Sequence, residues 1–409
     1  MIGRRAISSV KPPAIVVGLD SITGLQTARI LAARGVPIVG VARDRDHPFC
    51  RTRVCQKIVY ANTATEELIE ALEHIGPTLA DRSVLVPCTD PAVRQISRLR
   101  GRVSPWYHVV LPEAELLDLL IDKMRFYEYA SSKGLPIPQT FVLRSREDAE
   151  KAAGELDYPC ILKPPLKSDA WDENMHDKAL KISGVEEFLT TYEKAARWAS
   201  PLLAQQWIPG DDIQLFSCNC YLDASSTTLV TFVARKLRQW PPQTGTSCLG
   251  EECRNDVVLR ETVRLFEDAG FHGLGYLELK QHAETGAHYI VEPNVGRPTV
   301  RSAIAEAGGV ELLYTMYCDT VGLPLPENRE QQYRGAKWIY LRNDVRSALH
   351  YRRNGELTTR EWLRSWRGCR RDALFSLRDP RPFFADVWYG LNVVRNRRSE
   401  PKTVEAAAP

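Results

Sequence analysis

The amino-acid sequence predicts an α/β domain followed by a larger α+β region. Up to residue 112, short apolar strands alternate with amphipathic helical stretches, as in a parallel sheet with crossover helices. A helical passage punctuated by prolines, at residues 111–140, ends this alternation. Beyond it, apolar strands follow one another with few helices between them, which is typical of an α+β architecture. The length of 409 residues fits two or three domains.

Residues 1–112 are predicted to form a Rossmann-like domain. Two strands enclose a helix, and a second helix leads to a third strand, which makes a parallel sheet. The expected elements are residues 14–19, 25–35, 37–42, 65–76 and 83–88. The dinucleotide fingerprint G-x-G-x-x-G is absent at the first turn, so no NAD signature is predicted.

Polar residues stand near the carboxyl ends of these strands, where open α/β sheets bind ligands. Ser21 precedes the first helix, whose N-terminal amides can hold an anion. Arg43 follows the second strand, and Asp90 follows the third. All three are candidate substrate contacts. The alternative, that they are loop polar groups and helix caps, is at least equally supported.

The α+β region begins with a helix that carries Asp122 and Lys123. Its later elements are mostly apolar strands, with one long helix between the fifth and sixth of them. The expected strands are 141–144, 158–165, 202–208, 213–223, 228–236, 275–280 and 288–294, and the expected helix is 256–270.

The last two strands of this region are predicted to form a hairpin that pairs two carboxylates. Glu278 and Glu292 lie symmetrically about residue 285, so they are expected to be cross-strand partners. Strand alternation puts Asn294 on the same face as Glu292. Mg²⁺ prefers such oxygen ligands and completes its shell with substrate phosphates. The alternative is an exposed polar face of the strand pair.

Several cations end apolar strands and are candidates for binding anions. Lys163 closes a strand before two prolines, where its charge can meet phosphate oxygens, although a strand-end lysine is more often solvated. Arg235, Lys236 and Arg238 end another strand. These three either meet an anionic substrate, for which Arg238 is a candidate, or form a solvated strand end.

These segments, in this order, resemble the ATP-grasp superfamily over roughly residues 12–330. The resemblance is strongest to carboxylate–amine ligases of the D-aspartate ligase type. It rests on the segments DKMRFYEYASSKGLPIPQT, YPCILKPP, AQQWIPGDD, RKLRQWPPQTGTS and LELK…IVEPN. It implies an ATP-grasp fold with an N-terminal Rossmann-like (pre-ATP-grasp) domain. The expected parts are 1–112, a small subdomain 113–200, a large subdomain with the metal site 201–330, an appendage 331–398 and a disordered tail 399–409.

The resemblance also implies ATP and Mg²⁺ as cofactors, with two metal ions expected and Mn²⁺ as an alternative ion. Lys123 and Lys163 would contact the ATP phosphates, and Lys236 would approach the γ-phosphate. Arg297 would hold the substrate carboxylate or an acyl phosphate. Adenosine would be bound by Gln205, by the backbone of Gln206 and Ile208, and by Asp212 at the ribose; the metal ions would be bound by Glu278, Glu292 and Asn294. Two departures stand out, since Gln205 replaces a common glutamate and Tyr276 replaces an arginine of D-alanine–D-alanine ligases.

The activity that the resemblance implies is ATP-dependent joining of a carboxylate to an amine through an acyl phosphate, with release of ADP and phosphate. Small-molecule carboxylates and amines, such as amino acids, would be the substrates. One alternative is an ATP-grasp enzyme with another acceptor, for carboxylation or phosphoryl transfer. Another is a nucleotide-binding protein without catalysis.

Composition places the chain among ordinary globular proteins and excludes a many-span membrane protein. Hydrophobic residues make up 44% and charged residues 26%, and no apolar run approaches a membrane span. No secretory signal is recognised, and the ten cysteines include no C-x-x-C pair. These features predict a cytoplasmic protein with reduced thiols.

The net charge of +3 conceals a basic segment, because residues 342–398 hold 14 arginines against 6 acidic residues. Tryptophans and other aromatic residues lie among these arginines. We expect the aromatic residues to pack the segment onto the body while its arginines pair with acids there. Peripheral contact with an anionic membrane is the alternative, and nucleic-acid binding is the least expected.

Overall fold

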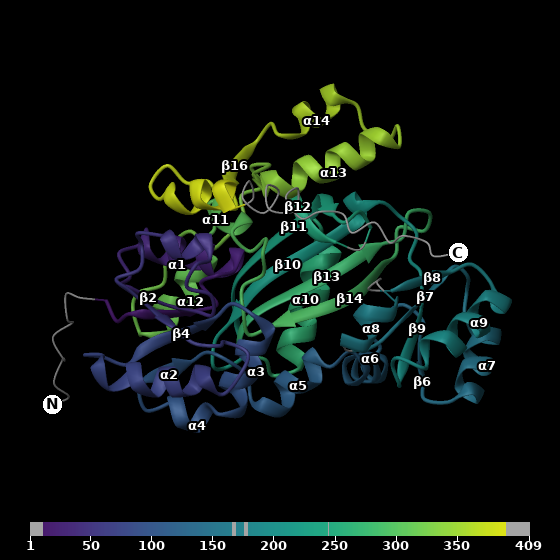
Figure 1. Cartoon of the computed structure of the whole chain (residues 1–409), viewed down its shortest axis with the longest axis horizontal. Coiled ribbons are helices and arrows are strands. Elements are labelled where there is room, and N and C mark those ends of the chain that lie inside the picture. Colours follow the sequence, from purple (N-terminus) through teal and green to yellow (C-terminus); the bar gives the residue numbers. More distant parts are fainter. Residues whose placement is uncertain (1–10, 166–168, 176–178, 244, 390–409) are drawn as a thin grey trace, which may run out of the picture.

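Three β-sheets organise the chain, each built from a different part of the sequence (Figure 1). The computed structural model describes residues 11–165, 169–175, 179–243 and 245–389. The tail predicted at 399–409 lies outside these ranges. The α/β and α+β fold class expected from the sequence is confirmed, since a parallel sheet precedes two mainly antiparallel sheets.

The N-terminal sheet is fully parallel, with the strand order β3-β2-β1-β4-β5. Its strands are β1 (Ala14–Val17), β2 (Ile38–Ala42), β3 (Lys57–Tyr60), β4 (Ser83–Pro87) and β5 (Tyr107–Val109). The Rossmann-like prediction is confirmed, but β3 and β5 were missed. Both are edge strands of at most four residues, and their mixed side chains lack the apolar run that marks a buried parallel strand.

Helices cover this sheet, and two more lead out of it. They are α1 (Ile22–Ala32), α2 (Glu67–Ile75), α3 (Asp90–Arg98), α4 (Arg100–Val103), α5 (Ala114–Ile121) and α6 (Lys123–Ser132). The expected single helix around Asp122 is two helices. The Asp122 carboxylate accepts hydrogen bonds from the backbone N–H groups of Met124 and Arg125, so it caps α6 and makes Lys123 the first helical residue.

The small sheet has the order β6-β9-β7-β8 and lies at the right of Figure 1. Its elements are β6 (Thr140–Leu143), α7 (Arg146–Glu155), β7 (Cys160–Lys163), α8 (Asp169–Met175), β8 (Leu180–Ile182), α9 (Val185–Ala195) and β9 (Leu202–Gln206). Because β9 pairs with both β6 and β7, the small subdomain extends to residue 206. The predicted boundary at 200 therefore falls before its central strand.

The central sheet has seven strands in the order β14-β13-β10-β11-β12-β15-β16. These are β10 (Leu215–Leu222), β11 (Thr228–Trp240), β12 (Thr246–Glu252), β13 (Gly273–Gln281), β14 (His288–Val295), β15 (Lys337–Ile339) and β16 (Cys369–Asp372). The helices of this part are α10 (Asp256–Asp268), α11 (Ile304–Gly308), α12 (Leu312–Thr320), α13 (Leu341–Arg353) and α14 (Thr359–Ser365). The predicted boundary at residue 330 is thus corrected, since two strands of this sheet come from beyond it.

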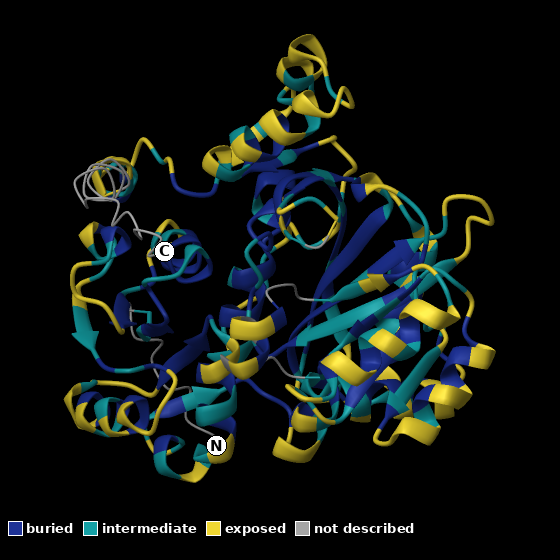
Figure 2. Ribbon diagram, turned by 45° about the vertical axis from the view of Figure 1, so that its right-hand side comes forward, coloured by how far each residue is buried: buried dark blue, intermediate teal, exposed yellow. Residues whose placement is uncertain are grey.

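The C-terminal appendage packs onto the rest of the chain as expected. In the ion pair that joins them, however, the acidic residue belongs to the appendage and the arginine to the rest of the chain. Trp338 is fully buried, and its indole N–H donates to the Gln26 side chain. Asp379, which is 1% exposed, binds Arg29 of α1 at 2.9 Å. Here an acidic residue of the segment meets an arginine of the body, the reverse of the predicted pairing. Most arginines of the segment are left on the surface, where Figure 2 shows α13 and α14 largely exposed.

Within the described ranges, no helix is long and apolar enough to cross a membrane. Large apolar side chains are nevertheless exposed near the end of the described chain, among them Leu377 at 85% and Trp388 at 68%. Peripheral membrane contact through this segment stays a prediction.

Candidate functional site

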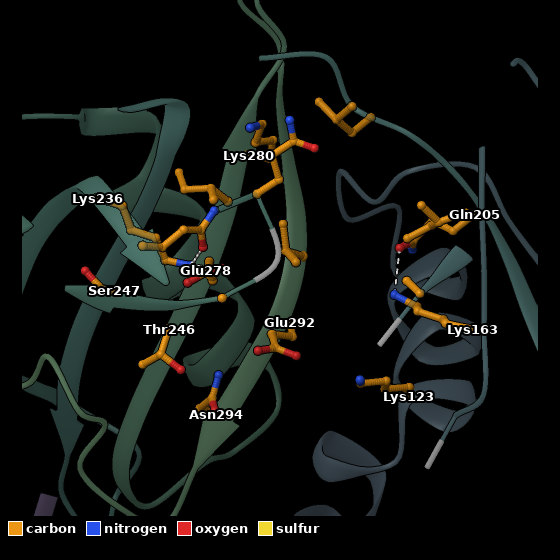
Figure 3. A pocket seen from close by; sticks show the side chains of 18 of the residues that line it. Lys123, Lys163, Gln205, Lys236, Thr246, Ser247, Glu278, Lys280, Glu292 and Asn294 are labelled. Atoms are coloured by element: carbon orange, nitrogen blue, oxygen red, sulfur yellow. Dashed lines mark hydrogen bonds and ion pairs between the residues drawn. The ribbon is translucent and has the colours of Figure 1, made fainter. Parts of the chain in front are cut away.

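A cavity of about 490 Å³ lies between the small sheet and the central sheet (Figure 3). It brings together most of the residues predicted to bind nucleotide and metal, although they lie far apart in the sequence. The cavity is lined by Lys123, Lys163, Gln205, Gln206, Ile208, Lys236, Glu278, Glu292, Asn294 and Arg297, among others. In Figure 3, the hairpin acids and Lys236 stand on one side, and Lys123, Lys163 and Gln205 face them from the other.

The β13–β14 hairpin pairs the two acids as predicted, since Glu278 is the cross-strand partner of Glu292. Asn294 is paired with Tyr276 on the same strands, two residues further along. The register shifts between Glu278 and Leu279, so the hairpin is not one uniform ladder. This bulge lies directly beside the acids, where bulges commonly redirect a side chain toward a site.

The two acids differ in how the protein holds them. Glu278 accepts hydrogen bonds from Lys236 Nζ at 3.0 Å and from the Tyr276 hydroxyl at 3.2 Å. Burial alone would raise the pKa of Glu278, but the charges of Lys236 and Arg301 and these hydrogen bonds hold it below its usual value. Glu292 has no hydrogen bond or ion pair from its side chain within the described part of the chain. Its carboxylate is therefore free to bind a ligand.

These residues suit a hard divalent cation that is shared with a ligand. Asn294 offers an amide oxygen, which already accepts a hydrogen bond from Arg297 Nη2 at 3.0 Å. No group of three or more His, Cys, Asp or Glu side chains able to hold a metal is found among the described residues. Two carboxylates and one amide leave much of the coordination of Mg²⁺ to water and to phosphate oxygens, as is usual for this ion.

Lys163 is a half-buried cation without a carboxylate partner among the described residues. Its Nζ donates to the Gln205 side-chain oxygen at 2.9 Å and lies 5.6 Å from the centroid of the Tyr127 ring. Burial lowers its pKa to about 8, although the charge of Glu292 acts in the opposite direction. A neutral glutamine thus leaves this lysine available for an anion, where a glutamate would have neutralised it.

We expect the affinity for MgADP to depend on pH through Lys163. The free lysine is protonated below about pH 8, and a bound phosphate raises its pKa, so binding favours the protonated form. The affinity should be level at lower pH and fall above pH 8 by up to about tenfold per pH unit. Titration calorimetry at several pH values measures this change.

The Lys163→Arg protein is the matched control, because a guanidinium stays charged throughout this range. Its affinity should vary much less between pH 7 and 9. If the Lys163→Arg protein keeps the pH dependence of the wild type, the titrating group is Lys280 instead. Burial also lowers the pKa of Lys280 to about 8.

The residues after β9 line the cavity beside Lys163, as expected for an adenine site. The Gln206 backbone N–H donates a hydrogen bond to the backbone oxygen of Gln139 at 2.9 Å. The carbonyl of Gln206 is therefore the group left to bind a ligand. The Ile208 N–H has no hydrogen bond within the described residues. Lys181 Nζ lies over the Trp207 ring, 4.5 Å from the ring centroid. A free donor beside a free acceptor is the pattern that an adenine edge requires.

Asp212 is placed differently from its predicted role at the ribose. It is 7% exposed and is not among the residues that line the cavity. Its carboxylate accepts hydrogen bonds from the Gln239 side chain at 2.6 Å and from the Tyr351 hydroxyl at 2.7 Å. This residue ties β11 and α13 together, so a ribose contact finds no support in its surroundings.

The predicted substrate contact of Arg238 is corrected. Arg238 Nε lies 2.8 Å from Asp344 Oδ1, and the two side chains are 7% and 0% exposed. Trp362 and Trp366 each donate an indole N–H to the same carboxylate at 2.9 Å. We call these four residues the Asp344 cluster. It fastens α13 and α14 to the central sheet, and its arginine is not available to a substrate.

Two of the three N-terminal candidates have local structural roles. Ser21 Oγ caps α1 by accepting from the Gly24 N–H at 3.0 Å. Arg43 meets its neighbours through its backbone N–H, which donates to Asp20 at 2.9 Å, and its side chain is exposed. Neither residue lines the cavity. For both, the alternative of loop and cap residues describes the structure.

The third candidate, Asp90, pairs with Arg297 across the domain boundary, with Nη2 and Oδ2 2.8 Å apart. Both line a second cavity of about 600 Å³ next to the first, together with Arg94 and Gln95. Lys123, Glu292 and Asn294 line both cavities. A substrate contact of Asp90 therefore stays a prediction, and the charge of Arg297 is already balanced in this state.

No family model matches the chain. Over 94 residues it is 37% identical to a D-alanine–D-alanine ligase of Ectopseudomonas mendocina, which is 23% of this chain and 28% of that protein. Over 221 residues it is 22% identical to the D-aspartate ligase of Enterococcus faecium, which is 52% of each. The chain thus spans about half the length, or less, of these curated relatives.

Solved structures match most of the chain. The N5-carboxyaminoimidazole synthetase of Staphylococcus aureus in complex with ADP aligns with 85% of this chain and 86% of its own, at a TM-score of 0.64 and 17% identity. The biotin carboxylase domain of a Hydrogenobacter thermophilus 2-oxoglutarate carboxylase, with MgADP and bicarbonate, covers 77% and 71% at a TM-score of 0.60 and 14% identity. The chain therefore has the ATP-grasp fold of these structures.

Two residues that line the cavity were missed in the sequence. Lys280 lies two residues after Glu278 and donates from Nζ to the backbone oxygen of Asp211 at 2.8 Å. Arg301 is 2% exposed, lines the same cavity and contacts Tyr276. Strand alternation beyond Glu278 could have pointed to Lys280. Nothing in the local pattern marks Arg301, because it stands in a loop after β14.

Proposed function

We propose that this ATP-grasp protein is an ATP-dependent carboxylate–amine ligase that forms an amide through an acyl phosphate. One observation carries the proposal. The paired acids Glu278 and Glu292 face the lysines Lys123 and Lys163 across a single cavity, with Lys236 held against Glu278. An oxygen set for a divalent cation opposite half-buried lysines is suited to a nucleoside triphosphate.

The residues of the chain would position the reactants and balance charge. Lys123 and Lys163 would hold the phosphate oxygens, and Lys236 would approach the γ-phosphate while it stays paired with Glu278. Bound Mg²⁺ would neutralise charge on the phosphates, held by Glu278, Glu292 and Asn294. The wall that the small sheet places over the cavity would limit water, which otherwise hydrolyses an acyl phosphate.

The likeness to D-alanine–D-alanine and D-aspartate ligases supports amino acids as substrates. In the proposed reaction, a carboxylate oxygen bonds to the γ-phosphorus as the bond to ADP breaks. The amine nitrogen then bonds to the acyl carbon as phosphate leaves and a proton is lost from nitrogen. The second cavity, which opens beside Glu292, is the space that such substrates would occupy.

The test is to incubate the full-length protein with ATP, Mg²⁺ and pools of amino acids, following ADP release and the masses of products. Hydroxylamine in place of the amine should yield a hydroxamate. ADP release that depends on bicarbonate instead of an amine would favour the carboxylation alternative. AMP as the product would exclude the acyl-phosphate route.

A further inference from the structure

Helix α13 of the C-terminal appendage lies beside strand β11 of the central sheet (Figure 1). The face that it turns to the strand is polar, because the fully buried Asp344 and Ser347 are followed one turn later by the half-buried Tyr351. Two leucines of the helix are instead exposed, Leu341 at 37% and Leu349 at 41%. A surface helix ordinarily buries its apolar stripe, so α13 is held largely by directed hydrogen bonds.

Two of these hydrogen bonds lead to Gln239, a residue of β11 that is fully buried and borders the main cavity. Ser347 Oγ donates to the backbone oxygen of Gln239 at 2.9 Å. The Tyr351 hydroxyl donates to Asp212 Oδ2 at 2.7 Å, and Gln239 Nε2 donates to Asp212 Oδ1 at 2.6 Å. The appendage therefore fixes both the backbone and the side chain of Gln239.

The other end of the Gln239 side chain meets Lys236, which is 6% exposed. Lys236 Nζ donates to Gln239 Oε1 at 3.2 Å and to Glu278 Oε1 at 3.0 Å. An amide accepts from an ammonium at its oxygen and donates to a carboxylate at its nitrogen, so the two partners determine the orientation of Gln239. Because Glu278 is a proposed metal ligand, Gln239 is the partner of Lys236 that the metal site does not share.

A bulge in β11 makes this contact possible. Lys236 and Gln239 are three residues apart, so a regular strand would turn their side chains to opposite faces. The register of β11 against β12 shifts on both sides of Arg238. As a result, Lys236 and Gln239 meet at the cavity, whereas Arg238 is turned to Asp344.

We propose that Tyr351, Asp212 and Gln239 form a hydrogen-bond network that positions Lys236 for the γ-phosphate of ATP. The inference rests on the proposed function, in which Lys236 approaches that phosphate. A lysine that is already ordered loses little further rotamer freedom when the nucleotide binds. Tyr351 and Asp212 act through Gln239 and are positioning residues. The appendage thus contributes to the site, although no residue in its described part, 331–389, lines the main cavity.

The test compares two nucleotides that differ in the γ-phosphate, ADP and β,γ-imido-ATP, each with Mg²⁺. Titration calorimetry measures their affinities for the full-length wild type and for the Tyr351→Phe and Asp212→Asn proteins. Tyr221→Phe is the matched control, because the Tyr221 hydroxyl donates to Asp319 at 2.6 Å in the same sheet and Tyr221 does not line the cavity. Thermal unfolding midpoints are recorded for every protein.

Tyr351→Phe should weaken binding of the imido analogue by about 3- to 10-fold, the range expected for one hydrogen bond. Asp212→Asn should weaken it by about 10- to 100-fold, since hydrogen bonds to a charged group are stronger. MgADP affinity should stay unchanged in both, because ADP has no γ-phosphate for Lys236 to meet. Tyr221→Phe should lower the unfolding midpoint about as much as Tyr351→Phe and leave both affinities unchanged.

Equal weakening of both nucleotides by Asp212→Asn would assign Asp212 to the ribose, as the family resemblance implies, and would overturn the inference. It would also be overturned if Tyr351→Phe lost stability like Tyr221→Phe but bound both nucleotides as the wild type does, since the α13 contacts would then be structural only. Failure of the wild type to bind MgADP would instead contradict the proposed function itself.

Discussion

Replacement of Glu292 by glutamine is expected to reduce Mg²⁺-dependent ATP turnover by about 10³-fold, the scale on which loss of one preorganised electrostatic contact acts. Glu292 faces the cavity, is paired in register with Glu278 and has no protein partner for its carboxylate in the described chain. Glutamine keeps the size and removes the charge. The fold should therefore be intact, and the loss should appear in turnover and in the Mg²⁺ concentration required.

Glu284→Gln is the matched control, since Glu284 stands in the exposed turn of the same hairpin. It should leave turnover and stability unchanged. Glu278→Gln should lose activity and also destabilise, because it leaves the buried Lys236 without its carboxylate partner. Full turnover by the Glu292→Gln protein would show that the hairpin binds no catalytic metal.

Replacement of Asp344 by alanine is expected to lower the free energy of unfolding by about 3–5 kcal/mol, the range for breaking one side of a buried ion pair. The Asp344 carboxylate is fully buried and accepts from Arg238, Trp362 and Trp366. Its loss leaves the Arg238 guanidinium buried without a counter-charge and leaves the indole N–H groups of Trp362 and Trp366 without an acceptor. Urea unfolding followed by tryptophan fluorescence measures the effect, since the two indoles lie within the cluster.

Two further variants test whether the loss of stability arises from the burial of the ion pair and from the charge that is left without a partner. Asp386→Ala removes the partner of the more exposed Arg342 and should change the free energy of unfolding by less than about 1 kcal/mol. The double variant Arg238→Met, Asp344→Leu should recover most of the loss, because an apolar pair can replace a buried ion pair. A single variant as stable as the wild type would mean that the Asp344 cluster does not hold the C-terminal segment.

The hairpin could be predicted from the sequence because it is determined by residues that lie close together along the chain. Glu278 and Glu292 lie on either side of a short turn, and strand alternation alone brings both to one face. The same holds for the first strands and helices of the N-terminal sheet, whose apolar periods are set by neighbouring residues. Lys163 could be identified as the end of a strand, and Gln205 as a departure from relatives.

The ion-pair partner of each charged residue could not be predicted from the local sequence in this way. Arg238 and Lys236 are two residues apart on one strand, yet one meets Asp344 of α13 and the other Glu278 of β13. The strand bulges between them, with register shifts on both sides of Arg238. Which residue faces the cavity depends on that bulge and on partners more than 40 positions away, neither of which leaves a local pattern.

The sequence by itself determined the succession of sheets, the paired acids and the lysines of the proposed site, because periodicity and turn spacing act over a few residues. Only the tertiary structure decided that residues 337–372 complete the central sheet and that the arginine-rich segment is held by its aspartates. It also decided that Arg301 is buried among hydroxyl groups at the cavity wall, while Arg297 pairs with Asp90. Burial and pairing of a charge depend on which distant segments meet, and that is settled only when the chain is folded.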